Sequence, residues 1–217
     1  MEMEVPKQYG RLGGKSMLEH AIDALLASAR IDRVLVVVAG ADVAHRSMSE
    51  RRRVSFAAVG GALRADSVLN GVNTLLETHH AAENDWVLVH DAARPCLAPE
   101  ELSRLIESLH DDAVGGLLAL QVSDTLKREG YASRVGCTVT RAGLWRAATP
   151  QMFRLGMLRA ALFDPRVRAS ATDEAAAIEA LGHAPRLIEG FATNIKVTRP
   201  EDWALAEAIL RMQGRIE

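Results

Sequence analysis

Residues 86–95 constrain the fold of this chain more than any other stretch. They open with an uninterrupted apolar run, Trp86–Val89, of the length and composition that fill a buried parallel strand. Asp91 and Arg94 follow this run, and the proline that closes the stretch cannot continue a ladder of backbone hydrogen bonds. In open α/β sheets, ligands bind in the crevice beyond the carboxyl ends of the strands. The stretch therefore predicts an α/β sheet with Asp91 and Arg94 at its ligand-binding edge.

The side chains of Asp91 and Arg94 suit a phosphorylated ligand. A carboxylate is a hard oxygen ligand for Mg²⁺, and a guanidinium presents a fork of donors that matches phosphate oxygens. An Asp–Arg pair that only pins a surface turn has the same local sequence. Both interpretations are open at this point.

Composition excludes several classes of protein. The 217 residues are 48% hydrophobic and 4% aromatic, so aliphatic side chains must form the core of what we expect to be one domain. A formal charge of -2 gives no general attraction to nucleic acid or to an anionic membrane. The longest apolar run, residues 34–39, is too short to span a bilayer, and the opening residues do not resemble a signal peptide. Cys96 and Cys137 are too few for a disulfide framework. We expect a soluble cytoplasmic protein.

Buried strands and amphipathic helices alternate along the chain, which predicts a mostly parallel sheet flanked by helices. We expect an extended lead-in over residues 5–9 and strands at 34–38, 54–59, 86–89, 115–122, 186–189 and 194–197. We expect a first helix that begins at a capping box of Ser16 and Glu19 and ends at about residue 26. A second helix should begin at a cap formed by Asp66 or Ser67 and end at residue 78. Further helices are expected at 99–109, 155–162, 173–181 (capped by Thr172) and 200–211. Residues 41–53 are expected to form a loop or a short surface helix.

Two features depart from the simple alternation. Residues 124–140 are polar and predict a hairpin that projects from the body, within an arm of about residues 124–147. The chain also enters the α/β pattern on a helix, without the buried first strand and glycine-rich turn that usually open such a sheet. Either the first strand comes from elsewhere, or an N-terminal piece is missing from the sequence.

The segment 60–67 connects a predicted strand to a predicted helix. Gly60 and Gly61 allow a ligand to approach the backbone closely, and the helix N-terminus presents free N–H groups. Ser67 could bond a base edge, and Arg64 could reach a phosphate. Taken by itself, the segment is better explained as a plain turn with an Asp or Ser cap.

Several cations also lie near predicted strand ends. Lys7 lies near the start, Arg141 at the end of the hairpin and Lys196 late in the chain, while Thr125 precedes a lysine and an arginine. Each alone is more often a solvated charge, but several around one carboxylate indicate a polyphosphate site. The three residues 14–16 resemble the end of a phosphate-binding loop, but no strand precedes them and the helix-cap interpretation is better. The histidines at 79, 80 and 90 pair with no nucleophile and are expected to be structural or solvent-facing.

Seven short motifs occur together, in a fixed order, over residues 5–210. They are Pro-Lys-Gln-Tyr at 6–9, Gly-Gly at 60–61 with Arg-Ala-Asp-Ser at 64–67, His-Asp-Ala-Ala-Arg-Pro at 90–95, Asp-Thr at 124–125, Thr-Pro-Gln at 149–151, Thr-Asp-Glu-Ala at 172–175 and Asn-Ile-Lys-Val-Thr at 194–198. In this order they resemble the 2-C-methyl-D-erythritol 4-phosphate cytidylyltransferases of the non-mevalonate isoprenoid pathway. The resemblance covers nearly the whole chain.

The resemblance implies a Rossmann-like nucleotidyltransferase fold and a homodimer in which each projecting arm helps to complete the partner's site. It implies that CTP and methylerythritol phosphate give CDP-methylerythritol and pyrophosphate, with Mg²⁺ as cofactor. It assigns catalytic roles near the phosphates to Lys7, Arg94 and Lys196, nucleotide binding to Gly60, Gly61, Arg64, Ala65, Ser67, Asp91 and Ala92, metal binding to Asp91, and methylerythritol phosphate binding to Thr125 and Arg141.

The chain departs from the family pattern in three places. Nothing before Pro6 matches the family's first strand and its arginine-bearing glycine-rich loop, Ala62 replaces a frequent acidic residue, and Thr193 replaces a frequent aspartate. We therefore leave Ala62 and Thr193 out of the predicted site. Two other functions stay open: a cytidylyltransferase for another polyol phosphate such as ribitol 5-phosphate, and a nucleotide-binding module without catalytic activity.

Overall fold

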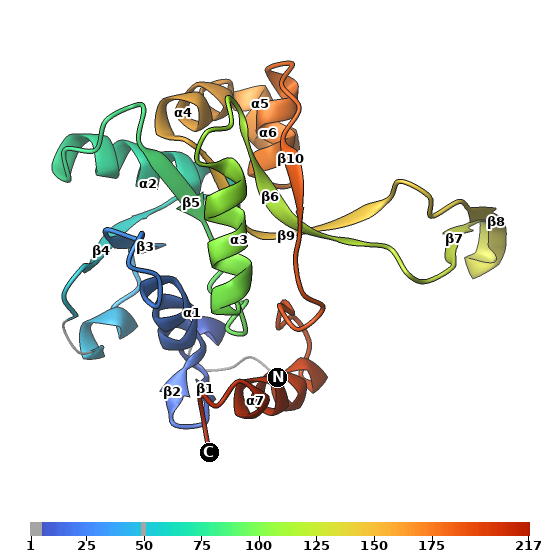
Figure 1. Cartoon of the computed structure of the whole chain (residues 1–217), viewed down its shortest axis with the longest axis horizontal. Helices are drawn as coiled ribbons and strands as arrows, with labels where there is room; N and C mark the ends of the chain where they lie inside the picture. Colours follow the sequence, from blue (N-terminus) through green and yellow to red (C-terminus); the bar gives the residue numbers. More distant parts are fainter. Residues whose placement is uncertain (1–5, 49–50) are drawn as a thin grey trace.

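The computed structural model describes residues 6–48 and 51–217, which form an α/β body and a long projecting arm (Figure 1). The strands are β1 (Arg11–Leu12), β2 (Lys15–Ser16), β3 (Val34–Ala39), β4 (Val54–Gly60), β5 (Trp86–Val89), β6 (Gly115–Gln121), β7 (Leu126–Glu129), β8 (Val135–Val139), β9 (Trp145–Arg154) and β10 (Arg186–Glu189). The helices are α1 (Met17–Leu26), α2 (Arg64–Thr78), α3 (Pro99–Leu109), α4 (Leu155–Phe163), α5 (Pro165–Ser170), α6 (Glu174–Ala180) and α7 (Glu201–Met212). Three short 3₁₀ segments are η1 (Lys7–Tyr9), η2 (Ala44–Ser47) and η3 (Tyr131–Ser133). None of the helices in these residues is long and apolar enough to cross a bilayer.

The larger sheet has four strands in the order β10-β6-β9-β5. Strands β10, β6 and β5 run in one direction, and β9 runs against them between β6 and β5. The predicted α/β fold with strands of mostly one direction is therefore confirmed. The expected setting of β5 was wrong in one respect: its pairing is antiparallel, with Trp86 opposite Arg154 and Val89 opposite Gln151.

A second sheet pairs β3 with β4 in parallel, and no ladder joins it to the four-stranded sheet within the described residues. Between β3 and β5 lies a groove of about 970 Å³, lined by both strand edges and by the helices above and below them. The groove explains why Trp86–Val89, expected to be buried, is only partly buried.

Helices cover both faces of the sheets. On one face, α1 and α3 share a hydrophobic cluster with β3, with Ile22, Val36 and Leu105 among its members. On the other face, α2, α4 and α6 share a second cluster that contains Val72 and Leu158. A third cluster, around the C-terminal helix α7, buries β1 and the start of α1.

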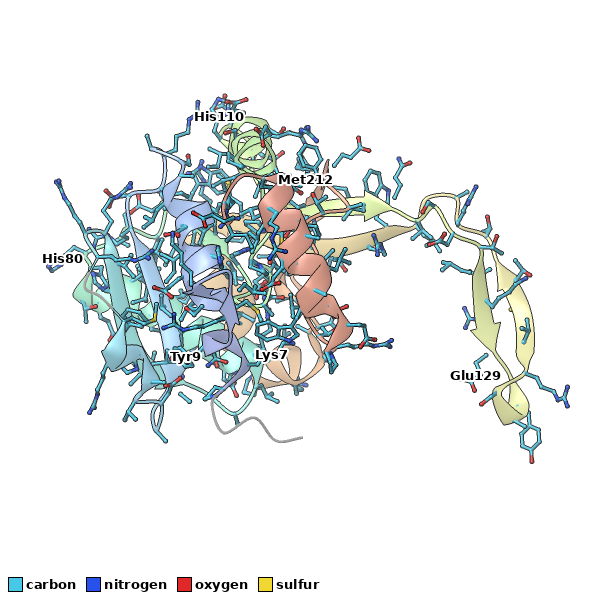
Figure 2. The ribbon with its side chains drawn as sticks, turned by 90° about the horizontal axis from the view of Figure 1, so that it is seen from below. Lys7, Tyr9, His80, His110, Glu129 and Met212 are labelled. Carbon is cyan, nitrogen blue, oxygen red and sulfur yellow. The ribbon has the colours of Figure 1, made fainter. Side chains whose placement is uncertain are left out.

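The arm is the antiparallel hairpin of β7 and β8 (Figure 1). Glu129, the last residue of β7, lies far out from the body, whereas Lys7 and Tyr9 lie on the body near α1 (Figure 2). Tyr131 is 95% exposed and Val135 is 64% exposed. The predicted projecting hairpin is therefore confirmed.

The local predictions hold where a helix carries its own start signal. Ser16 and Glu19 form the expected capping box, with the Glu19 amide donating to Ser16 Oγ at 3.2 Å. Helix α2, in contrast, begins two residues before the expected cap, and Asp66 accepts from the Leu63 amide at 3.2 Å. Helix α6 is capped by Asp173 and not by Thr172.

Two other predictions were wrong, and one helix was not predicted. Lys7–Tyr9 forms a 3₁₀ turn instead of an extended lead-in, while residue 5 lies outside the described residues. Residues 194–197 form no strand, although Val197 donates one backbone hydrogen bond to Ala93 at 2.8 Å. Helix α5, Pro165–Ser170, was not expected.

Candidate functional site

Asp91 lies two residues beyond the end of β5, and the neighbouring strand β9 fixes its backbone. The Asp91 amide donates to Thr149 Oγ1 at 3.1 Å. Because Thr149 lies within β9 and is buried, the start of the loop after β5 is held by the centre of the larger sheet. The prediction that Asp91 lies at a carboxyl edge of the sheet is confirmed.

Three cationic side chains surround the Asp91 carboxylate. Lys196 Nζ donates to Oδ2 at 2.8 Å, and Arg64 donates to Oδ1 from Nη2 at 3.0 Å and from Nε at 3.1 Å. Arg94 Nε lies 3.9 Å from Oδ2. Burial alone raises the pKa of Asp91, but the Lys196 hydrogen bond and the Arg64 charge outweigh it and hold the pKa below the ordinary value. Asp91 is therefore an anion held among cations.

Arg64 is bound on its other side by a second carboxylate, that of Glu174. Arg64 Nη1 and Nη2 donate to Glu174 Oε1 at 2.5 Å and Oε2 at 3.1 Å, a two-pronged contact of the kind that fixes a guanidinium plane. The Glu174 side chain is 2% exposed, against 37% for Arg64. Burial raises the pKa of Glu174, and the Arg64 guanidinium opposes this shift. Sequence reasoning assigned no role to Glu174, because its 110-residue separation from Arg64 leaves no local signal.

Arg94 is also held in place. Its Nη1 donates to the Asn194 carbonyl at 2.7 Å, and Asn194 Nδ2 donates to the Thr149 carbonyl at 3.0 Å. Arg94 Nε is buried and has no hydrogen-bond partner among the described residues. We call Arg64, Asp91, Arg94, Glu174 and Lys196 the Asp91 cluster; it carries three cationic and two acidic side chains.

His90 supports this loop from beneath. Its Nε2 lies 3.1 Å from the carbonyl oxygen of Arg94, which can only accept, so Nε2 carries the proton. Nδ1 then accepts from Thr149 Oγ1 at 3.0 Å. Burial lowers the pKa of His90 to about 4, although the contacts with the Arg94 carbonyl and Thr149 oppose this shift, so the ring is neutral at physiological pH. The expected structural role of His90 agrees with this geometry.

The glycine segment before α2 is explained in large part by packing. A Cβ on Gly61 would lie 2.4 Å from Asp66 Cβ, and one on Gly60 would lie 2.9 Å from the Val38 carbonyl oxygen. Ser67 Oγ accepts from the Gly61 amide at 3.0 Å and donates to the Leu63 carbonyl at 3.2 Å. The nucleotide contacts assigned to Gly60, Gly61, Ala65 and Ser67 stay predictions.

Lys7 adjoins the Asp91 cluster through a second cavity of about 190 Å³, which Lys7 lines together with Ala92 and Ala93. Asp91, Ala92 and Lys196 line the end of the larger groove. Ala92 and Ala93 line both cavities, so Lys7 and Lys196 lie around adjoining spaces. Their catalytic roles stay predictions.

Thr125 and Arg141 lie elsewhere. Both are exposed at the base of the arm, Thr125 just before β7 and Arg141 just after β8. Across residues 6–48 and 51–217, neither forms a hydrogen bond or ion pair with the Asp91 cluster. The structure of one chain therefore does not bring the two predicted substrate-binding residues to the other site residues.

The chain matches a family model over almost its whole length. The family described as 2-C-methyl-D-erythritol 4-phosphate cytidylyltransferase matches residues 1–212. This chain belongs to that family. The cytidylyltransferase of Laribacter hongkongensis is 55% identical, with 99% of this chain and 92% of that protein covered. The one from Pseudomonas entomophila is 52% identical, with 93% and 86% covered.

Solved structures of the same family share the fold. A crystal structure of a 4-diphosphocytidyl-2C-methyl-D-erythritol synthase superposes with a TM-score of 0.87 at 45% identity, covering 94% of this chain and 95% of that one. The Francisella tularensis cytidylyltransferase gives a TM-score of 0.83 at 31% identity, covering 95% and 94%. The chain is therefore a nucleotidyltransferase with the Rossmann-like fold of this family.

Proposed function

We propose that this chain transfers the cytidylyl group of CTP to 2-C-methyl-D-erythritol 4-phosphate, releasing pyrophosphate and forming CDP-methylerythritol. The Asp91 cluster is the observation that supports this proposal most strongly: Arg64, Arg94 and Lys196 surround one carboxylate at the sheet edge. The chain also belongs to the family that carries out this reaction. The relatives' names give the substrate, and the cluster supplies charges that suit it.

The chemistry explains why the site contains cations and no catalytic triad. The nucleophile is a phosphate oxygen of the methylerythritol substrate, which is anionic at neutral pH and requires no protein base. The protein must bring two phosphorylated molecules together and align the oxygen with the α-phosphorus of CTP. Lys7, Arg94 and Lys196 are the groups we assign to offsetting their repulsion and the charge that develops in the transition state.

We propose Mg²⁺ as the metal cofactor, with Asp91 as its protein ligand. Magnesium is commonly held by one or two carboxylates together with substrate phosphates, so the single carboxylate of Asp91 fits this chemistry. The described residues contain no group of three or more acidic, histidine or cysteine side chains that could hold a metal without the substrate. When bound, the ion would neutralise phosphate charge beside Asp91.

We propose that the arm mediates a homodimer and brings Thr125 and Arg141 to the partner's site. Three features support this proposal: the arm projects from the body, it exposes Tyr131 and Val135, and its base carries the two residues that lack contact with their own Asp91 cluster. Light scattering on the purified chain should give twice the chain mass, and removal of residues 126–139 should give the monomer mass. A monomer before the deletion would refute the arrangement.

Substrate assays separate this function from its alternatives. Pyrophosphate release from CTP and Mg²⁺ should be faster with methylerythritol phosphate than with ribitol 5-phosphate, and a preference for ribitol phosphate would assign the other polyol. Calorimetry with CTP and Mg²⁺ tests the alternative of a nucleotide-binding module without catalytic activity. Binding of CTP without release of pyrophosphate would favour that alternative. A cytoplasmic location, proposed from composition, is tested by fractionating cells that express the chain.

A further inference from the structure

The segment that carries Lys196 is irregular, yet it makes two of the contacts that shape the Asp91 cluster. Residues 190–197, which we call the Lys196 segment, follow β10 and belong to no strand or helix. Lys196 Nζ nevertheless donates to Asp91 Oδ2 at 2.8 Å, and the carbonyl oxygen of Asn194 accepts from Arg94 Nη1 at 2.7 Å. Because these residues form no ladder, other contacts must hold the segment in place.

The two ends of the Lys196 segment are held by single hydrogen bonds. The Phe191 amide donates to Glu101 Oε1 at 2.6 Å, and Glu101 is fully buried near the start of α3. The Val197 amide donates to the Ala93 carbonyl oxygen at 2.8 Å. The first bond lies at the opposite end of the segment from Lys196, and the second joins it to another irregular loop. Neither bond ties the middle of the segment to a strand.

Asn194 ties the middle of the Lys196 segment to the larger sheet. Its Nδ2 donates to the Thr149 carbonyl oxygen of β9 at 3.0 Å, and Asn194 is 2% exposed. The Thr149 hydroxyl oxygen accepts from the Asp91 amide at 3.1 Å. One residue of β9 therefore holds both parts of the cluster: the Asp91 backbone directly, and the Lys196 segment through Asn194.

The hydrogen bonds of Asn194 indicate which of its side-chain atoms matters. Nδ2 has the Thr149 carbonyl as its acceptor, whereas Oδ1 is buried and has no hydrogen-bond partner among the described residues. A buried polar atom left unpaired costs about 1–3 kcal/mol. An apolar side chain would avoid this cost but would lose the donor to Thr149. The amide donor is therefore the useful part of this side chain.

We propose that Asn194 is a positioning residue, whose side-chain amide holds the Lys196 segment against β9 and thereby places Lys196 and Arg94 around the Asp91 carboxylate. This inference rests on the function proposed above, in which these two cations offset the charge of the reacting phosphates. Because Asn194 is buried, it acts through the cations and not by contact with a substrate.

A double-mutant cycle tests the proposal, with pyrophosphate release from CTP and methylerythritol phosphate as the assay. Asn194→Ala should lower kcat about tenfold and leave KM for CTP within about twofold, because the lost placement matters in the transition state. Lys196→Ala should lower turnover about 10²-fold. The double variant should lose clearly less than the product of about 10³-fold, because Asn194 acts partly through Lys196. A full 10³-fold loss, or a higher KM with unchanged kcat, would overturn the proposal.

Val197→Ala is the matched control for stability. Val197 is fully buried in the same segment and packs in the hydrophobic cluster around α7. Its truncation should lower the melting temperature, as Asn194→Ala should, but leave kcat within about twofold of the wild-type value. An equal fall of kcat in the two variants would show that Asn194 contributes to stability alone, and would overturn the proposal.

A second measurement does not depend on the reaction. Acetic anhydride modifies lysine amines, and mass spectrometry gives the extent at each one. Lys196 is 44% exposed and 2.8 Å from Asp91, while Lys15 is 49% exposed and 2.7 Å from Asp23, so Lys15 is a matched internal reference. Asn194→Ala should raise the modification of Lys196 relative to Lys15 about threefold, because Lys196 is released from its ion pair.

The two measurements separate the two proposals. An unchanged ratio of modification between Lys196 and Lys15 would overturn the positioning role of Asn194, whatever the activity. A raised ratio in a chain that releases no pyrophosphate from CTP and methylerythritol phosphate would support the positioning role and refute the proposed function.

Discussion

The buried ion pair between Arg64 and Glu174 gives the most direct prediction for stability. Glu174 is 2% exposed and receives two hydrogen bonds from the Arg64 guanidinium. Glu174→Gln keeps the shape of the side chain and one acceptor oxygen, but it removes the charge that Arg64 faces. The substitution therefore isolates the electrostatic part of the contact without creating a cavity.

The structure sets the size of the expected loss. Breaking a fully buried ion pair costs about 3–5 kcal/mol, because the remaining charge stays buried without its partner. Arg64 is 37% exposed and keeps Asp91 as a second partner, so water and Asp91 compensate for part of the loss. We expect the free energy of unfolding to fall by about 2 kcal/mol.

Urea denaturation followed by circular dichroism measures this change. With a slope of about 2 kcal/mol per molar, the midpoint should fall by about 1 M. Glu179→Gln is the matched control, since Glu179 lies exposed on the same helix α6, and its midpoint should not move. If the two variants shift the midpoint equally, the Arg64–Glu174 pair does not contribute as argued.

Three further predictions concern the phosphate-binding cations, pH and backbone packing. Lys7→Ala or Lys196→Ala should lower turnover about 10²-fold, the scale of one lost preorganised contact. Lys15→Ala, which removes a cation paired with Asp23, should not, and near-wild-type steady-state rates in both site variants would refute their roles. The protein should lose about 3 kcal/mol of stability as pH falls from 6.5 towards the folded pKa of His90, about 4, because the unfolded chain binds a proton below pH 6.5 and the folded ring does not. His90→Gln should flatten a urea-unfolding profile in this window, and an unchanged slope would contradict the neutral assignment. Gly61→Ala should lower the free energy of unfolding by about 1–3 kcal/mol in thermal unfolding, because the added Cβ would lie 2.4 Å from Asp66 Cβ. A variant as stable as the wild type would show that the turn relaxes freely.

The parts of the fold that depend on local signals could be predicted from the sequence. The capping box of Ser16 and Glu19 and the apolar run Trp86–Val89 carry their own hydrogen-bonding or burial pattern within a few residues. The position of β9 could not be predicted, because an antiparallel strand inserted between β6 and β5 depends on pairing with residues far away in the chain. Residues 194–197 were misassigned since their apolar members, including Val197, pack against α7 without forming a ladder.

The site divides in the same way. Asp91 and Arg94 were found because both follow one strand within a few residues, and the geometry places them together. Lys196 was assigned through the family resemblance, and its ion pair with Asp91 agrees with that assignment. Glu174 has no neighbouring signal that would indicate its contact with Arg64. Long-range ion pairs of this kind become visible only when the fold brings their residues together.

If cytidine triphosphate reacts at the Asp91 cluster, the rate of pyrophosphate release must depend on the charge of Asp91. With CTP, methylerythritol phosphate and Mg²⁺, Asp91→Asn should lower kcat/KM about 10²-fold or more, because the amide keeps the shape but removes the anion among Arg64, Arg94 and Lys196. Asp111→Asn, an exposed aspartate just beyond α3, should leave the rate unchanged. An Asp91→Asn enzyme as fast as the wild type would show that the Asp91 carboxylate takes no part in the reaction.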